Sequence, residues 1–144
     1  MQYAILKKAA LSVIICAAIT GLIILSFLGE GGIALTQFMI TYGLHFLLLF
    51  AGVGCLIVRI LHVFIKVKWF SDFALKFTDP AKFHCVFLGI GNSWMGILAI
   101  VLHVTGRANL FMVETMLPNL IVGVIILADI IFSRRKTRFS SSKH

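Results

Sequence analysis

Four apolar stretches of membrane-spanning length divide the chain. They cover residues 9–28, 36–65, 80–105 and 109–132. A helix that crosses a bilayer needs about 20 predominantly apolar residues, so each stretch is long enough to span a membrane. Charged residues make up only 12% of the sequence, against about 25% in a soluble domain. With 144 residues, the sequence predicts a single all-α integral membrane domain over residues 1–144, folded as an up-down four-helix bundle.

The basic residues are distributed unevenly between the two sides of such a bundle. Eleven of the thirteen fall before the first stretch, between the second and third or at the very start of the third, or after the fourth. By the positive-inside rule we expect both termini in the cytoplasm, with the protein in a bacterial cytoplasmic (inner) membrane. Because the basic residues cluster between apolar stretches, the net charge of +8 does not indicate nucleic-acid binding. The eleven residues are Lys7, Lys8, Lys66, Lys68, Lys76, Lys82, Arg134, Arg135, Lys136, Arg138 and Lys143.

Two segments outside the apolar stretches have their own patterns. In residues 68–78, Trp69, Phe73 and Phe77 recur at helical spacing among lysines, which predicts a short amphipathic helix in the cytoplasmic membrane interface. An aromatic belt with no further role is the alternative. The tail, residues 138–144, is predicted to be disordered. Asp79 and Pro80 are residue types that begin helices, so we expect the third long helix to start there.

Four histidines lie in the second and third stretches, two in each. Ionisable side chains are costly in hydrocarbon, so an intramembrane histidine indicates a functional site. Imidazole is also an axial ligand of b-type haem. The separations of 17 and 19 residues correspond to about 26 and 29 Å along a helix. Antiparallel helices would pair His62 with His84 near one membrane face and His45 with His103 near the other. The pattern predicts two bis-histidine haem sites, with a single haem on one pair as the alternative.

Basic side chains and glycines near the histidines fit the haem hypothesis. Lys66 and Arg107 each stand four residues beyond a histidine, on the same helix face, where a haem propionate would need a cation. Ordinary flanking charges are the alternative. Arg59 is expected to snorkel to the interface or to contact a haem. Glycines between the histidines leave room for a macrocycle or for close helix packing: Gly52, Gly54, Gly89, Gly91 and Gly96.

Other polar residues interrupt the apolar stretches. Glu114 is a candidate to exchange a proton with a quinol, or to pair with Arg107. Asp129 is expected to pair with the arginine cluster that follows the fourth stretch. Asn92 and Trp94 lie in the middle of the third stretch, where we expect them to bond to other helices. The cysteines form no C-x-x-C motif, so the sequence lacks the usual zinc, iron–sulfur and c-type haem signatures.

Short motifs carry a resemblance to membrane-embedded di-haem b-type cytochromes. They are Thr20-Gly21-Leu22-Ile23, His45, His62-x-x-x-Lys66-x-x-Trp69, His84 and His103-Val104-Thr105-Gly106. The chain resembles cytochrome-b-561-like proteins and the small cytochrome b subunits of quinone-linked oxidoreductases. The resemblance implies electron transfer through haem b between the quinone pool and a redox partner subunit. It also implies an electron-transfer subunit rather than a self-contained enzyme.

Two other functional classes remain open. One is a cofactor-free four-helix scaffold or assembly subunit of a larger membrane complex. The other is a carrier or metal-ion permease that uses the histidines. The second is less favoured, because no stretch is interrupted at its middle except near Pro118.

Overall fold

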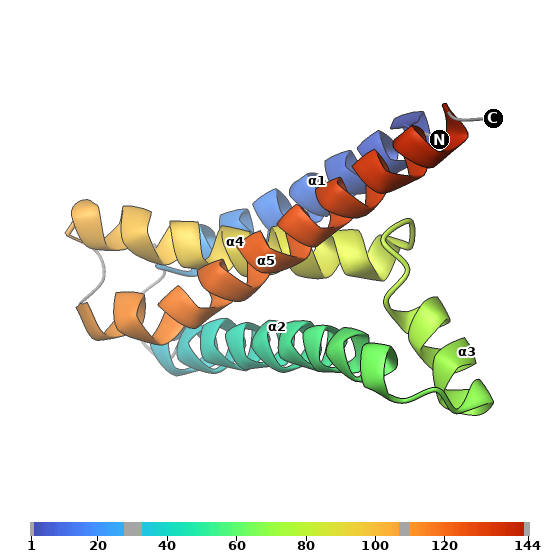
Figure 1. Ribbon diagram of the computed structural model, residues 1–144. Coiled ribbons are helices and arrows are strands. Elements are labelled where there is room, and N and C mark those ends of the chain that lie inside the picture. The colour runs from blue at the N-terminus through green and yellow to red at the C-terminus, as the bar shows by residue number, and fades with distance from the viewer. Residues whose placement is uncertain (1, 28–32, 107–109, 143–144) are drawn as a thin grey trace.

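The computed structural model describes residues 2–27, 33–106 and 110–142, and all regular elements in these ranges are α-helices. The four long helices are α1 (Gln2–Phe27), α2 (Ile33–Phe64), α4 (Phe83–Val104) and α5 (Leu110–Ser141). Each contains an apolar span of 20 to 24 residues, long enough to cross a membrane. A short helix, α3 (Lys68–Phe77), connects α2 to α4 (Figure 1). The predicted all-α membrane bundle and its four spanning helices are confirmed.

Helix α4 is the most enclosed element of the bundle. Half of its membrane span is buried inside the molecule, against 11% of the α1 span and 17% of the α2 span. The buried residues come mainly from α4 and the faces of α2 and α5 that touch it. The core therefore lies around α4, and α1 and α2 keep most of their apolar surface exposed.

Small residues allow α4 and α5 to approach closely. A Cβ atom added to Gly123 of α5 would lie 2.4 Å from the backbone nitrogen of Ser93, and one added to Gly96 of α4 would lie 3.0 Å from Cα of Leu120. Real Cβ atoms do not come this near to backbone, so side chains at these positions would force the helices apart. Such small-residue contacts are the usual basis of helix packing in membranes, where no hydrophobic force drives helices together.

Several helix ends differ from the sequence prediction. Asp79 and Pro80 do not begin α4: Asp79 accepts a hydrogen bond from the Ala81 backbone N–H (2.9 Å) in the turn before Phe83, the first residue of the helix. His84 still lies within α4, as predicted. The expectation of a disordered tail from residue 138 is wrong for residues 138–141, because α5 continues to Ser141.

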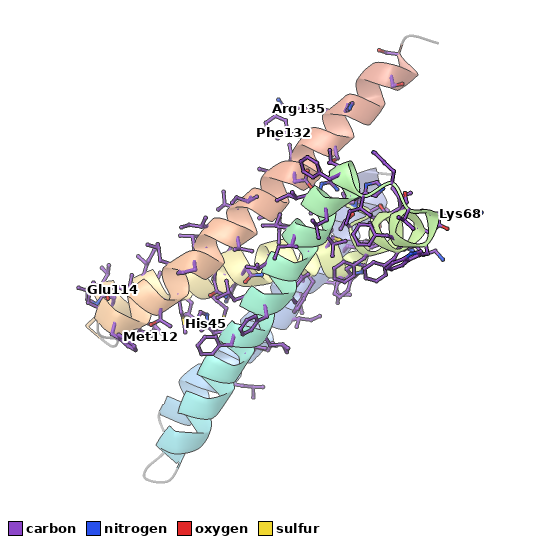
Figure 2. All side chains as sticks on the ribbon, turned by 60° about the horizontal axis from the view of Figure 1, so that its bottom comes forward. His45, Lys68, Met112, Glu114, Phe132 and Arg135 are labelled. Atoms are coloured by element: carbon purple, nitrogen blue, oxygen red, sulfur yellow. The ribbon has the colours of Figure 1, made fainter. Side chains whose placement is uncertain are left out.

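The chain ends and α3 lie at the same end of the molecule. In Figure 1 the start of α1 and the end of α5 lie at the upper right and α3 lies below them on the same side, as an up-down bundle requires. Figure 2 shows Lys68 at this end and Glu114 at the opposite end. We call it the basic end; its described basic residues include Lys7, Lys8, Lys66, Lys68, Lys76, Lys82, Arg135 and Lys136.

Candidate functional site

A buried polar network joins α2, α4 and α5 in the interior. The Asn92 side-chain amide donates to the Leu48 carbonyl of α2 (3.0 Å) and to the Leu88 carbonyl of its own helix (2.8 Å). Asn119 of α5 donates to the Asn92 side-chain oxygen (3.0 Å) and to the His45 carbonyl (3.2 Å). Asn92, Asn119 and His45 are fully buried. The predicted bonding of Asn92 across helices is confirmed, and the network ties three helices together.

His45 is the one predicted iron ligand that lies in this network. Its imidazole approaches the Asn119 side chain and packs against Phe46, with 4.9 Å between the ring centroids. Figure 2 shows His45 where α2 passes the other helices. The fully buried position means that any ligand at this histidine must displace protein groups.

A second polar cluster surrounds Arg59 toward the basic end. Its guanidinium forms an ion pair with Asp129 of α5 (2.7 Å) and donates to the Ser133 hydroxyl (3.0 Å). It also donates to the Thr78 carbonyl (3.3 Å), in the connection between α3 and α4. The sequence did not predict this partner for Asp129; its expected partners include Arg134 and Arg138, whose side chains lie outside the described part of the structure. Arg59 links three parts of the chain.

Helix α1 is tied by two hydrogen bonds, one to α4 and one to the turn that precedes α4. The Trp94 indole donates to the Thr20 hydroxyl (2.7 Å), which confirms that Trp94 bonds across helices. The Lys8 ammonium donates to the Ala81 carbonyl, just before α4 begins. These contacts hold α1 at both ends of its span.

His62 and His84 both hold α3, at different points. The His62 Nε2 atom lies 3.0 Å from the Ser71 hydroxyl, and the His84 Nε2 atom lies 2.5 Å from the Phe77 carbonyl. The His84 ring also stacks on Phe77, with 5.6 Å between centroids. Ser71 and Phe77 are six residues apart, which is about 9 Å along a helix. The two histidines therefore contact α3 at different points, and these contacts have no partner in common.

The structure does not place His45 level with His103 either. Counted from the contact between Asn92 and Leu48, His45 lies three residues along α2 and His103 lies eleven residues along α4, in the same direction through the bundle. At about 1.5 Å per residue, their depths differ by about 12 Å. His103 is exposed at the end of α4.

The other predicted haem contacts stand in different surroundings. Lys66 lies in the connection after α2, which ends at Phe64, so it does not share a helix face with His62. Arg107 lies outside the described residues. Glu114 is exposed near the start of α5.

The glycines between the histidines serve mainly to pack helices. A Cβ atom at Gly52 would lie 2.8 Å from the Asn92 amide and 2.8 Å from Val122, and one at Gly89 would lie 2.8 Å from Leu127. Gly96 faces Leu120 in the same way. Protein atoms fill the space beside these three glycines, whereas a Cβ atom at Gly54 would meet nothing within 4 Å.

Sequence reasoning missed Asn119 and Ser71. Asn119 had a visible signal, because it is a polar residue within an apolar stretch and directly follows Pro118. Ser71 had none, since a serine in an amphipathic helix is unremarkable. Within the described ranges, no group of three or more histidine, cysteine and acidic residues has the geometry to hold a metal ion.

Comparisons with known proteins add no further assignment: no family model, curated protein or solved structure matches the chain. The resemblance to b-type cytochromes therefore stays a prediction from the sequence motifs.

Proposed function

We propose that this chain is a scaffold or assembly subunit of a larger membrane complex, and that α1 receives a transmembrane helix of a partner. The observation that carries the proposal is the uncovered face of α1. Only 11% of its span is buried inside the molecule, against 50% for α4.

The uncovered face of α1 has the residue types that membrane helices use to associate. Ala17 is exposed, and a Cβ atom at Gly21 would meet nothing within 4 Å. Residues four apart share a helix face, so Ala17 and Gly21 form a small-x-x-x-small pair. Such a pair lets the backbone of a second helix come close. Contact with lipid tails does not require small residues, so the pair favours a helix as the neighbour.

The interior polar groups support the same function. Asn92, Asn119 and Arg59 are occupied with bonds between helices. Bonds of this kind hold a bundle in one arrangement, as a scaffold requires. In the proposed orientation the basic end faces the cytoplasm of a bacterial cell.

Native mass spectrometry and blue-native electrophoresis of the protein, extracted from its own membranes in a mild detergent, test the proposal. We expect a complex with a partner chain in fixed stoichiometry. Replacing Ala17 and Gly21 together by leucine should release the chain from it, because bulky side chains block close helix approach. Ala18→Leu is the matched control, since Ala18 is exposed on a different face of α1. A wild-type chain that runs alone, or a double variant that remains in the complex, would overturn the proposal.

Transmembrane electron transfer through haem b is the second candidate function. It is favoured by the presence of four histidines on α2 and α4, two helices that contact each other. In this proposal one or two haems link the quinone pool to a redox partner subunit. Binding through Nε2 would require His62 and His84 to exchange their partners on α3, because the Nε2 atom of each ring is engaged there.

An absorption spectrum of protein produced under haem-replete conditions tests this candidate. A sharp Soret band with reducible α bands is the expected result if it is correct. His45→Ala and His103→Ala should then remove the same haem, and His62→Ala and His84→Ala the other. Replacing Lys66 or Arg107 by leucine should lower the haem potential, since a cation would no longer compensate a propionate. A featureless spectrum rules the candidate out.

A further inference from the structure

We propose that α3 is a binding site for anionic phospholipid headgroups at the basic end of the bundle. Its aromatic face would insert among the lipids, and its lysines would contact the lipid phosphates. This inference is independent of the proposed function, because it concerns α3 and not the uncovered face of α1.

Helix α3 is held in a fixed position against the ends of α2 and α4. His62 contacts its Ser71, and His84 contacts the carbonyl and the ring of its Phe77. Ala74, on the same face, is completely buried. The orientation of α3 is therefore set by the bundle, and its opposite face points away from the protein.

The outward face of α3 combines large aromatic side chains with exposure. Trp69 is 73% exposed and Phe73 is 49% exposed. They are four residues apart, so they lie on one face of the helix. Tryptophan and phenylalanine on the apolar side of a short amphipathic helix insert at the boundary between headgroups and acyl chains. The location of α3 at the end of two membrane-spanning helices places these rings at that depth.

Positive charge surrounds this face. Lys68 and Lys76 lie on α3, and Lys66 and Lys82 lie in the connections on either side; all four are exposed. Asp72 is the one exposed acidic residue on α3. Lys68 stands at the helix N-terminus, where the helix dipole disfavours a cation and an external anion would offset that cost. Asp79 lies in the same connection as Lys82, so the segment has four lysines against two aspartates, and this excess of positive charge matches an anionic headgroup layer.

Charge complementarity favours lipid over a protein as the occupant. A phospholipid supplies an apolar chain and a phosphate at the depths where α3 presents aromatic rings and lysines. A partner protein that covered Trp69 and Phe73 would shield them from lipid. Brominated lipids would then fail to quench the fluorescence of Trp69.

Tryptophan fluorescence in nanodiscs tests the proposal. The protein carries Trp94→Phe, so that Trp69 is the only tryptophan. The discs contain phosphatidylcholine and phosphatidylglycerol in fixed proportion, with the bromine quencher on one lipid or the other. We expect brominated phosphatidylglycerol to quench Trp69 with an apparent affinity several-fold above that of brominated phosphatidylcholine, on the order of fivefold for each lysine that contacts a headgroup.

Two charge variants separate specific binding from a general charge effect. Lys68→Gln with Lys76→Gln should strongly reduce the preference, because the two lysines on α3 no longer contact headgroups. Lys7→Gln with Lys136→Gln removes the same charge from exposed positions elsewhere at the basic end, and should keep the preference. High salt should weaken it in the wild type. Equal quenching by both lipids, quenching by neither, or equal loss in both variants would overturn the proposal.

Discussion

At the residue scale, Asn92 is the side chain on which the interior contacts converge. Its amide donates to α2 and to its own helix, and its oxygen accepts from Asn119 of α5. Gly52 is needed beside it, because a Cβ atom there would lie 2.8 Å from the Asn92 amide. A full set of partners makes a polar side chain tolerable in the middle of a membrane-spanning helix.

We predict that Asn92→Leu destabilises the bundle by about 1–2 kcal/mol, because bonds between membrane helices are lost and Asn119 loses its side-chain acceptor. Thermal unfolding in detergent, followed by circular dichroism, measures the change. Thr115→Val is the control, since the Thr115 hydroxyl donates to the Phe111 carbonyl of its own helix. Equal stability of both variants would show that the network does not hold the helices together.

At the scale of the elements, two glycines of similar sequence context have opposite roles. Gly123 of α5 faces the Ser93 backbone at 2.4 Å and the Gly89 carbonyl at 2.8 Å. Gly43 of α2 has open space where its Cβ would lie. Gly123 is needed for the close contact between α4 and α5. Gly43 makes no close contact in the described fold that a side chain would disturb.

We predict that Gly123→Ala destabilises the protein by about 1–3 kcal/mol, because the added methyl group collides with backbone. Gly43→Ala should stabilise it by up to about 1 kcal/mol, since alanine favours a helix more than glycine does. The same thermal unfolding assay compares them. The description of the α4–α5 contact is wrong if Gly123→Ala is as stable as the parent.

At the scale of the whole molecule, the bundle has one basic end and one end with few charges. The basic end carries α3 and the end of α5, and the opposite end carries Glu114 (Figure 2). Positive charge is generally retained on the cytoplasmic side during insertion, so we expect the basic end to face the cytoplasm.

We predict that a membrane-impermeant thiol reagent applied to intact cells labels Thr105→Cys and not Ser140→Cys, in a chain whose native cysteines are replaced by alanine. Both positions are exposed and lie toward opposite ends of the bundle. Labelling after lysis controls for reactivity at Ser140→Cys. The reverse pattern would place the basic end outside.

The sequence by itself determined the four membrane spans, the short amphipathic helix between the second and third, and the bonding of Asn92 across helices. These properties depend on local hydropathy and helical period, which can be read from consecutive residues. Helix ends were less predictable: Asp79 and Pro80 form a turn before α4, because capping residues also favour turns.

Only the tertiary structure decided which side chains meet. It paired Arg59 with Asp129, directed His62 and His84 toward α3, and filled the space beside Gly52 and Gly89 with protein atoms. His62 and His84 lie at nearly equal distances from the ends of their apolar stretches, which suggested that they pair. Contact also requires that α2 and α4 have the right axial offset and the right rotation about their own axes. Close packing between the helices sets their axial offset and rotation, and this packing depends on residues far apart in the sequence.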